Sequence, residues 1–220
     1  MALPTIEPYP LPGAGDLPEN RAGWTLDPRR ALLVVHDMQR YFLRPYPEAQ
    51  PLHGALANIR ALSADCRAAG VPVVYTAKPG GMSAGERGLE QHFWGAGMRA
   101  VAEHTDIDER LAREPQDVLL TKWRYSAFVQ TDLAQRMEQA GRDQIILTGV
   151  YAHIGCLLTA ADAFMRDIQV FFVADAMADF TAEDHRFAVG YAARRCAVAV
   201  LADQARTALG ADLASTPARA

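Results

Sequence analysis

Six short, continuous apolar segments recur along the chain at nearly regular intervals. They run over 31–35, 71–76, 118–121, 144–148, 170–174 and 197–201, and the last four begin 26 or 27 residues apart. Apolar runs of this length are typical of strands buried on both faces, as in a parallel sheet. Parallel strands are joined by crossovers of a dozen or more residues, which are usually helical. The spacing therefore predicts repeated strand–helix–strand units.

Stretches with helical spacing separate these runs. They lie over about 54–69, 131–140, 156–167 and 182–195. Thr181 followed by Asp184 has the pattern of a helix start, and Gly70 and Gly141 stand where a helix would give way to a strand. We therefore predict a three-layer α/β/α domain with a six-stranded, mostly parallel sheet covered by helices on both sides.

The chain divides into an arm, a domain and a tail. Residues 1–30 contain six of the thirteen prolines, so we expect an extended N-terminal arm. Residues 31–205 carry the strand–helix pattern and are expected to form a single α/β domain. Residues 206–220 form an Ala-rich tail without a strong pattern. Within the domain, the long Gly-rich connection over 77–117 is of the kind that forms lids or binding loops.

Charge and cysteine content exclude several classes of protein. The 22 Lys and Arg against 26 Asp and Glu give a net charge of −4, which lacks the positive field that nucleic-acid binding requires. No apolar run approaches the roughly 20 residues of a membrane span, and the N-terminus lacks a signal-type pattern. The three widely spaced cysteines suggest neither a disulfide framework nor a zinc site. We expect a cytoplasmic protein with reduced thiols and no membrane or nucleic-acid partner.

Ligands of open α/β sheets bind beyond the carboxyl ends of the strands, so the residues that follow each run are the first candidates. These are Asp37, Lys78, Lys122, Tyr151, His153, Gly155 and Asp175. Each also has an ordinary structural explanation, because an Asp after a strand often caps a turn or helix and a Lys there is often solvated. Position alone therefore leaves the function open.

Two motifs suggest a nucleophile. Ser83 lies within a G-x-S-x-G match, but several residues past a strand rather than in the tight strand–turn–helix that such an elbow needs. Cys156 opens an apolar helix, where a cysteine more often serves packing. The sequence has no G-x-G-x-x-G, Walker A or H-E-x-x-H motif, so nucleotide, phosphate-loop and zincin sites have no support.

The chain resembles the isochorismatase family of the wider cysteine-hydrolase superfamily, in particular members that act in siderophore and phenazine synthesis. The resemblance extends from Tyr9 to about Leu201, and its most specific segments are 36–42, 121–128 and 149–156. It implies the isochorismatase-like hydrolase fold. It also implies a homodimer.

The resemblance makes the position of the superfamily's thiol informative. Amidohydrolases of the superfamily use an Asp-Lys-Cys triad, with the Cys six residues after a Gly and seven before an Asp. Counting from Gly149 and from Asp162 places Gly155, not Cys156, at that position. Neighbouring residues of a helix point about 100° apart, so Cys156 cannot simply replace the missing thiol. A site with Asp37 and Lys122 but no thiol suits acid-catalysed hydrolysis of a vinyl ether.

By resemblance, Asp37 is the proton donor, and Lys122 binds a substrate carboxylate or orders the site. The other implied contacts are Arg87, Tyr151 and the Gly155 N–H to substrate carboxylates and hydroxyl, with Phe42, Trp94 and Tyr125 as apolar walls. The related members have Gln where this chain has Lys78, which adds a cation that could bind a carboxylate but would disfavour an ammonium substituent near ring carbon 2. Some superfamily members carry a cis peptide before this segment, so we expect one between Val150 and Tyr151.

The predicted function is hydrolysis of the enolpyruvyl ether of isochorismate or 2-amino-2-deoxyisochorismate, small dianions derived from chorismate. The products are pyruvate and a dihydro-hydroxybenzoate or dihydro-hydroxyanthranilate, and no metal or cofactor is expected. One alternative is a thiol amidohydrolase that uses Cys156. Another is a catalytically silent binding subunit.

Overall fold

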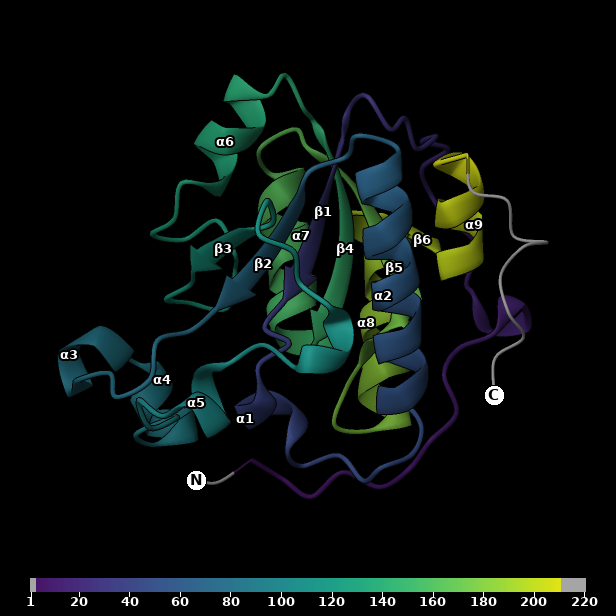
Figure 1. Ribbon diagram of the computed structural model, residues 1–220. Helices are drawn as coiled ribbons and strands as arrows, with labels where there is room; N and C mark the ends of the chain where they lie inside the picture. Colours follow the sequence, from purple (N-terminus) through teal and green to yellow (C-terminus); the bar gives the residue numbers. More distant parts are fainter. Residues whose placement is uncertain (1–2, 211–220) are drawn as a thin grey trace.

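The computed structural model describes residues 3–210 and contains a six-stranded sheet whose neighbouring strands are all parallel (Figure 1). The strands are β1 (Ala31–His36), β2 (Val73–Ala77), β3 (Val118–Thr121), β4 (Gln144–Val150), β5 (Gln169–Ala178) and β6 (Val198–Val200). They lie in the order β3-β2-β1-β4-β5-β6. The predicted six-stranded sheet is confirmed, and it is parallel throughout rather than mostly parallel.

Helices cover both faces of this sheet. They are α2 (Leu52–Ala68) and α9 (Ala202–Ala208) on one face, and α6 (Leu133–Gln139), α7 (Leu157–Phe164) and α8 (Ala182–Arg195) on the other. Because successive strand side chains point to opposite faces, Leu33 and Val35 enter the core beneath α2, whereas Leu32 and Val34 enter the core beneath α7 and α8. Figure 1 shows α2 in front of the sheet and α7 and α8 behind it, which confirms the three layers.

The main helices start and stop close to the predicted positions because local signals set their ends. The Thr181 hydroxyl accepts a hydrogen bond from the Asp184 N–H at 3.0 Å and so caps the start of α8. Gly70 and Gly141, which follow α2 and α6, have φ angles of +70° and +62°. Glycine adopts this left-handed conformation without steric cost, so it ends a helix readily.

The strand order reverses direction between β1 and β4, so the connections that leave these two strands diverge at the carboxyl edge of the sheet. Short helices gather there (Figure 1): α1 (Arg40–Leu43), α3 (Ala84–Arg87), α4 (Glu90–Trp94) and α5 (Ala102–Thr105), with a 3-10 turn over Glu109–Leu111. A π-helical turn over Ala152–Cys156 joins β4 to α7. The 77–117 connection therefore contains three short helices and one 3-10 turn.

Both ends of the described chain pack on this domain. The N-terminal arm has one short 3-10 turn, Ala14–Asp16, and buries Ile6 and Tyr9. The Tyr9 hydroxyl accepts a hydrogen bond from the Asp179 N–H at 2.7 Å. Of the predicted tail, residues 206–208 belong to α9, and 211–220 lie outside the described residues.

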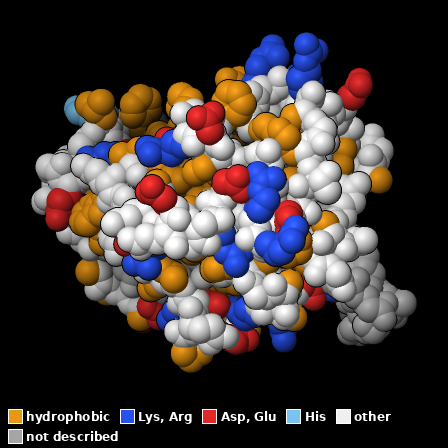
Figure 2. All heavy atoms as spheres, turned by 90° about the horizontal axis from the view of Figure 1, so that it is seen from above, with side chains coloured by type: hydrophobic (Ala, Val, Ile, Leu, Met, Phe, Trp, Pro, Cys, Tyr) orange, Lys and Arg blue, Asp and Glu red, His pale blue; other side chains and the backbone are white. Residues whose placement is uncertain are grey.

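The surface seen from above the amino ends of the strands intersperses Lys and Arg with Asp and Glu, and hydrophobic side chains gather along one edge (Figure 2). This face does not present a field of one sign. Within residues 3–210, no helix combines the length and the apolar character that crossing a bilayer requires.

Candidate active site

A pocket with about 690 Å³ of empty volume, its open mouth included, lies beyond the carboxyl ends of β1 to β4. All nine side chains and backbone groups predicted to form the site line it: Asp37, Phe42, Lys78, Arg87, Trp94, Lys122, Tyr125, Tyr151 and Gly155. The pocket lies at the point where the strand order reverses, as is general for open α/β sheets.

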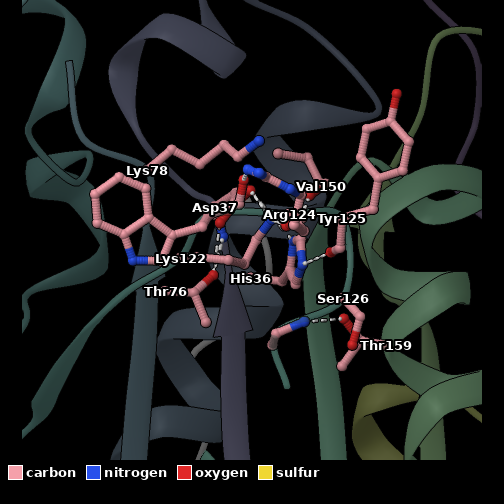
Figure 3. A network of polar contacts seen from close by, with 12 residues as sticks. His36, Asp37, Thr76, Lys78, Lys122, Arg124, Tyr125, Ser126, Val150 and Thr159 are labelled. Atoms are coloured by element: carbon pink, nitrogen blue, oxygen red, sulfur yellow. Dashed lines mark hydrogen bonds and ion pairs between the residues drawn. The ribbon is translucent and has the colours of Figure 1, made fainter. Parts of the chain in front are cut away.

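Asp37 is the centre of the polar network in Figure 3. One carboxylate oxygen, Oδ2, lies 2.9 Å from the Lys122 Nζ, and the other, Oδ1, accepts a hydrogen bond from the Thr76 hydroxyl at 2.6 Å. The Asp37 N–H donates to the same hydroxyl at 3.0 Å. Asp37 has a φ of 49°, a left-handed conformation that is uncommon for residues other than glycine. The residue is thus held at both its backbone and its side chain.

Opposing influences act on the ionisation of Asp37. Burial disfavours the carboxylate and raises its pKa, but the positive charge of Lys122, the neighbouring His36 and the hydrogen bond from Thr76 lower it. The balance places the pKa of Asp37 below its ordinary value. In the free site, Asp37 is therefore a carboxylate at neutral pH.

Lys122 is almost completely enclosed, with 1% of its surface exposed. Its Nζ donates to the backbone carbonyl of Arg124 at 2.5 Å in addition to its ion pair with Asp37. Two of its three protons are thereby directed at fixed acceptors, and a third is free to point at a ligand.

A second group of charges lies across the pocket, where α3 and α4 fold over the site. Lys78, Arg87 and Glu90 are each at most 7% exposed. The Glu90 Oε2 accepts hydrogen bonds from the Lys78 Nζ and from the Arg87 Nη1, the latter at 3.3 Å. Burial first, and then the repulsion of Lys122, lower the pKa of Lys78 to about 8. Glu90 was not predicted as a site residue.

Aromatic side chains form the walls of the pocket. The Trp94 Nε1–H donates to the Tyr125 hydroxyl at 2.6 Å, and the Tyr151 hydroxyl donates to the Phe42 carbonyl at 2.7 Å. Phe180, which the sequence did not single out, packs on Tyr151 with ring centroids 4.3 Å apart and also lines the pocket. These contacts hold the walls in fixed orientations.

His36 fills the space where a side chain at position 155 would lie. A Cβ built on Gly155 would come within 2.1 Å of the His36 Cε1. The His36 Nδ1 lies 2.9 Å from the Val150 carbonyl oxygen, and its Nε2 lies 3.2 Å from that of Tyr125. Burial lowers the pKa of His36 to about 4, so the ring is neutral at pH 7. The position that the sequence spacing predicts for the superfamily thiol thus holds a glycine covered by an imidazole.

The predicted cis peptide bond between Val150 and Tyr151 is present.

Four other candidates from the sequence lie outside the pocket lining. Cys156 is fully buried in the core beneath α7 and α8, and its Sγ lies 3.8 Å from the Thr148 carbonyl oxygen. Burial raises the pKa of its thiol well above the ordinary value. Ser83 caps α3. Asp175 lies inside β5 instead of after it, and its Oδ1 accepts from the Ala202 N–H at the start of α9 at 2.6 Å.

The fourth candidate, His153, is paired with Asp179, whose carboxylate accepts from the His153 N–H and lies 2.6 Å from its Nδ1. These two residues and Asp184 are the one group in residues 3–210 whose ligand atoms lie close enough together to hold a metal ion. Asp184 also accepts a hydrogen bond from the Thr181 hydroxyl, at 2.7 Å. These contacts explain the cluster as helix capping and loop anchoring.

Comparison with known proteins gives consistent results. The family model of the isochorismatase domain matches residues 31–204. The phenazine biosynthesis protein PhzD1 of Pseudomonas aeruginosa is 55% identical over 202 residues, which cover 92% of this chain and 97% of that protein. The isochorismatase of Bacillus subtilis is 50% identical over 204 residues, 92% of this chain and 65% of that protein.

Among solved structures, a cysteine hydrolase from Pseudomonas syringae pv. phaseolicola superposes with a TM-score of 0.77 at 22% identity. The match covers 88% of this chain and 97% of that one. At this identity the likeness concerns the fold.

Proposed function

Because this chain belongs to the isochorismatase family, we propose that it hydrolyses the enolpyruvyl ether of isochorismate or of 2-amino-2-deoxyisochorismate. The products are pyruvate and a dihydro-hydroxybenzoate or dihydro-hydroxyanthranilate. The name of the Pseudomonas aeruginosa relative refers to phenazine biosynthesis, and that of the Bacillus subtilis relative to isochorismate. A role in secondary metabolism fits both.

One observation carries the proposed mechanism: a carboxyl group and an ammonium group meet in the pocket without a thiol. The Asp37 Oδ2 lies 2.9 Å from the Lys122 Nζ, and the His36 ring covers Gly155. Acyl-enzyme chemistry requires a nucleophile within reach of the substrate. Hydrolysis of a vinyl ether requires an acid beside the reacting carbon and a water molecule, and Asp37 supplies that acid.

In the proposed reaction, the Asp37 carboxyl donates its proton to the terminal methylene carbon of the enolpyruvyl group. The electron pair of the carbon–carbon double bond forms the new C–H bond and leaves an oxocarbenium ion. Water adds to this cation and loses a proton, which returns to the Asp37 carboxylate. The resulting hemiketal breaks its bond to the ring oxygen, which takes the hydroxyl proton, and pyruvate and the cyclohexadienol leave.

Asp37 must gain a proton before this step, because its pKa lies below the ordinary value in the free site. A substrate with two carboxylates supplies the means. Its negative charge competes with Asp37 for Lys122 and disfavours a second anion close by, so binding raises the pKa of Asp37. We infer that the dianion and one proton bind together.

The rest of the pocket is suited to hold such a dianion. Arg87, Lys78 and Lys122 supply donors for its carboxylates, since an Arg fork matches carboxylate geometry. Tyr151 and the Gly155 N–H complete the polar contacts, and the walls formed by Phe42, Trp94 and Tyr125 enclose the apolar part of the ring.

Pyruvate release from isochorismate and from 2-amino-2-deoxyisochorismate, coupled to lactate dehydrogenase, tests the proposal. The wild type is expected to release pyruvate. Asp37→Asn should lose at least about 10³-fold in kcat because the proton donor is gone. Cys156→Ser should keep most of the activity because Cys156 lies outside the pocket lining. Thermal melting of each variant checks that it is folded.

The same measurements separate the alternatives. A thiol amidohydrolase would lose its activity with Cys156→Ser and would release ammonia from amides instead of pyruvate from enol ethers. A silent binding subunit would release pyruvate from neither substrate.

A further inference from the structure

Glu90 is a buried carboxylate in a pocket whose proposed substrate is itself an anion. It lines the pocket, and 7% of its surface is exposed. Its Oε2 is shared by the Lys78 Nζ and the Arg87 Nη1. Its other oxygen, Oε1, is buried without a hydrogen-bond partner among residues 3–210. Buried carboxylate oxygens normally have donors, so this acceptor lacks the partner that a ligand could provide.

Lys78 has unused hydrogen-bond donors, whereas the Glu90 Oε1 is an unused acceptor. Its backbone N–H and carbonyl are bonded to the Gln39 side chain, at 2.8 and 2.9 Å, which fixes its place in the pocket wall. Its Nζ contacts Glu90 and carries two further protons. Its pKa, lowered to about 8 by burial and by Lys122, leaves the amine mostly charged at pH 7.

We propose that Lys78 and Glu90 bind the substrate as one net-neutral pair, in which Lys78 donates to a carboxylate or hydroxyl oxygen and the Glu90 Oε1 accepts from a hydroxyl or amino group. This inference rests on the proposed function and adds a specificity-determining residue, Glu90, to it. An amide side chain also offers one donor and one acceptor without net charge. The pair therefore offers a ligand the same polar groups as a neutral amide.

The charge balance of the pocket agrees with this assignment. Lys78, Arg87 and Lys122 face Asp37 and Glu90, so three cations and two carboxylates leave one net positive charge, with His36 neutral. Without Glu90, an isolated Lys78 would repel an ammonium group on the substrate. With Glu90 beside it, the fields of the two opposite charges largely cancel at distances greater than their separation. The aminated substrate is then compatible with Lys78, in contrast to the effect expected of an unpaired lysine.

A double-mutant cycle on Lys78→Gln and Glu90→Gln tests the pair. The readout is the ratio of kcat/KM for 2-amino-2-deoxyisochorismate to kcat/KM for isochorismate at pH 7. Glu90→Gln removes the carboxylate that balances Lys78 and should lower this ratio about tenfold. Lys78→Gln removes one cation and leaves Glu90 paired with Arg87, so it should raise the ratio by a similar factor. The double variant should return the ratio to within about threefold of the wild type.

A structural role for Glu90 would change stability without moving the ratio in opposite directions. An unchanged ratio in both single variants, or shifts of the ratio in the same direction in the two, would overturn the proposal. Glu103→Gln, an exposed carboxylate of α5, is the matched control and should leave the ratio unchanged. Thermal melting of all four variants identifies any that fail to fold.

The cycle can be repeated without turnover. In the Asp37→Asn background, calorimetric dissociation constants of the two substrates should show the same reversal between the single variants. If the wild type releases pyruvate and neither ratio moves, only the pair is refuted. If the wild type releases no pyruvate, the proposed function fails, and the binding ratios decide on the pair. Absence of binding of either substrate overturns both.

Discussion

At the scale of single residues, Asp37 must change its protonation state during the reaction. The carboxyl has a lowered pKa in the free site, yet the proposed step needs it protonated. His36, Thr76 and Lys122 face it in the free site, and none of them supplies the proton, because His36 is neutral and the other two donate hydrogen bonds to the carboxylate or pair with it. We therefore infer that Asp37 takes up a proton from solution when the substrate binds.

This coupling predicts a pH profile. Because kcat/KM reports the free enzyme, it should fall about tenfold for each pH unit between 6 and 8, whereas kcat should stay nearly constant over the same range. Above about pH 8 the fall should steepen as Lys78 loses its charge. Lys78→Arg should remove that second limb, since Arg keeps its charge. A kcat/KM that is flat or rises from pH 6 to 8 would contradict proton uptake and favour a thiolate mechanism.

Gly155 gives a second prediction at this scale. A methyl group at this position would meet the His36 ring at 2.1 Å, so Gly155→Ala must displace the ring or the turn. The expected effects are a stability loss of about 1–3 kcal/mol and a fall in kcat/KM of at least about tenfold. Gly85→Ala is the control, because no atom lies within 4 Å of its added Cβ. Chemical denaturation and the pyruvate assay measure both, and equal behaviour of the two variants would refute the packing argument.

At the scale of elements, the predictable parts of the chain are those whose pattern is local. The strand runs and the long helices follow from periodicity, and the start of α8 follows from the Thr181 signal. The helices α3, α4 and α5 were missed because four or five residues are too few to show a helical period. Tertiary contacts hold them, as when the buried Gln39 side chain donates to the Thr105 carbonyl at 2.8 Å.

The same limit applies to the candidate site. All nine predicted groups line one pocket. They could be predicted because they follow strand ends or are implied by the family resemblance. Glu90 and Phe180 neither follow a predicted strand nor lie in one of the family segments. The burial of Glu90 depends on how α3 and α4 fold over Lys78, and the contact of Phe180 with Tyr151 depends on the turn after β5. Thr76 was recognised only as the end of a strand run and His36 only as the first residue of the 36–42 family segment, because the sequence does not show the side-chain bonds that they make.

The cap of α8 yields a prediction at the element scale. Thr181→Ala removes the acceptor of the Asp184 N–H and should lower the free energy of unfolding by about 1 kcal/mol. Thr181→Ser keeps the hydroxyl and should lose much less. Denaturant titration of the three proteins compares them, and a Thr181→Ala variant as stable as the wild type would show that the cap contributes nothing.

At the scale of the whole molecule, charge is distributed unevenly. The chain has a net charge of −4, whereas the pocket holds three cations against two carboxylates. An anionic substrate is therefore attracted by the local field of a concave site rather than by the overall charge. The net charge argues against nucleic-acid binding, but it does not predict the charge of a small ligand.

Exposed apolar side chains on α7 and α8 bear on the assembly state of the molecule. We propose that the chain forms a homodimer and that the second copy covers the outer face of α7 and α8, where Leu158, Met165, Phe187 and Tyr191 are between 42% and 75% exposed. Large apolar side chains clustered on adjacent helices are typical of interaction surfaces.

Light scattering coupled to size exclusion should give twice the 24.0 kDa of one chain. Phe187→Glu should shift the mass toward one chain, because the interface would then bury an unpaired charge. Leu119→Glu, on the edge strand β3, is the control and should stay dimeric. A wild type with the mass of a single chain refutes the dimer, and dissociation by Leu119→Glu alone moves the interface to the β3 edge.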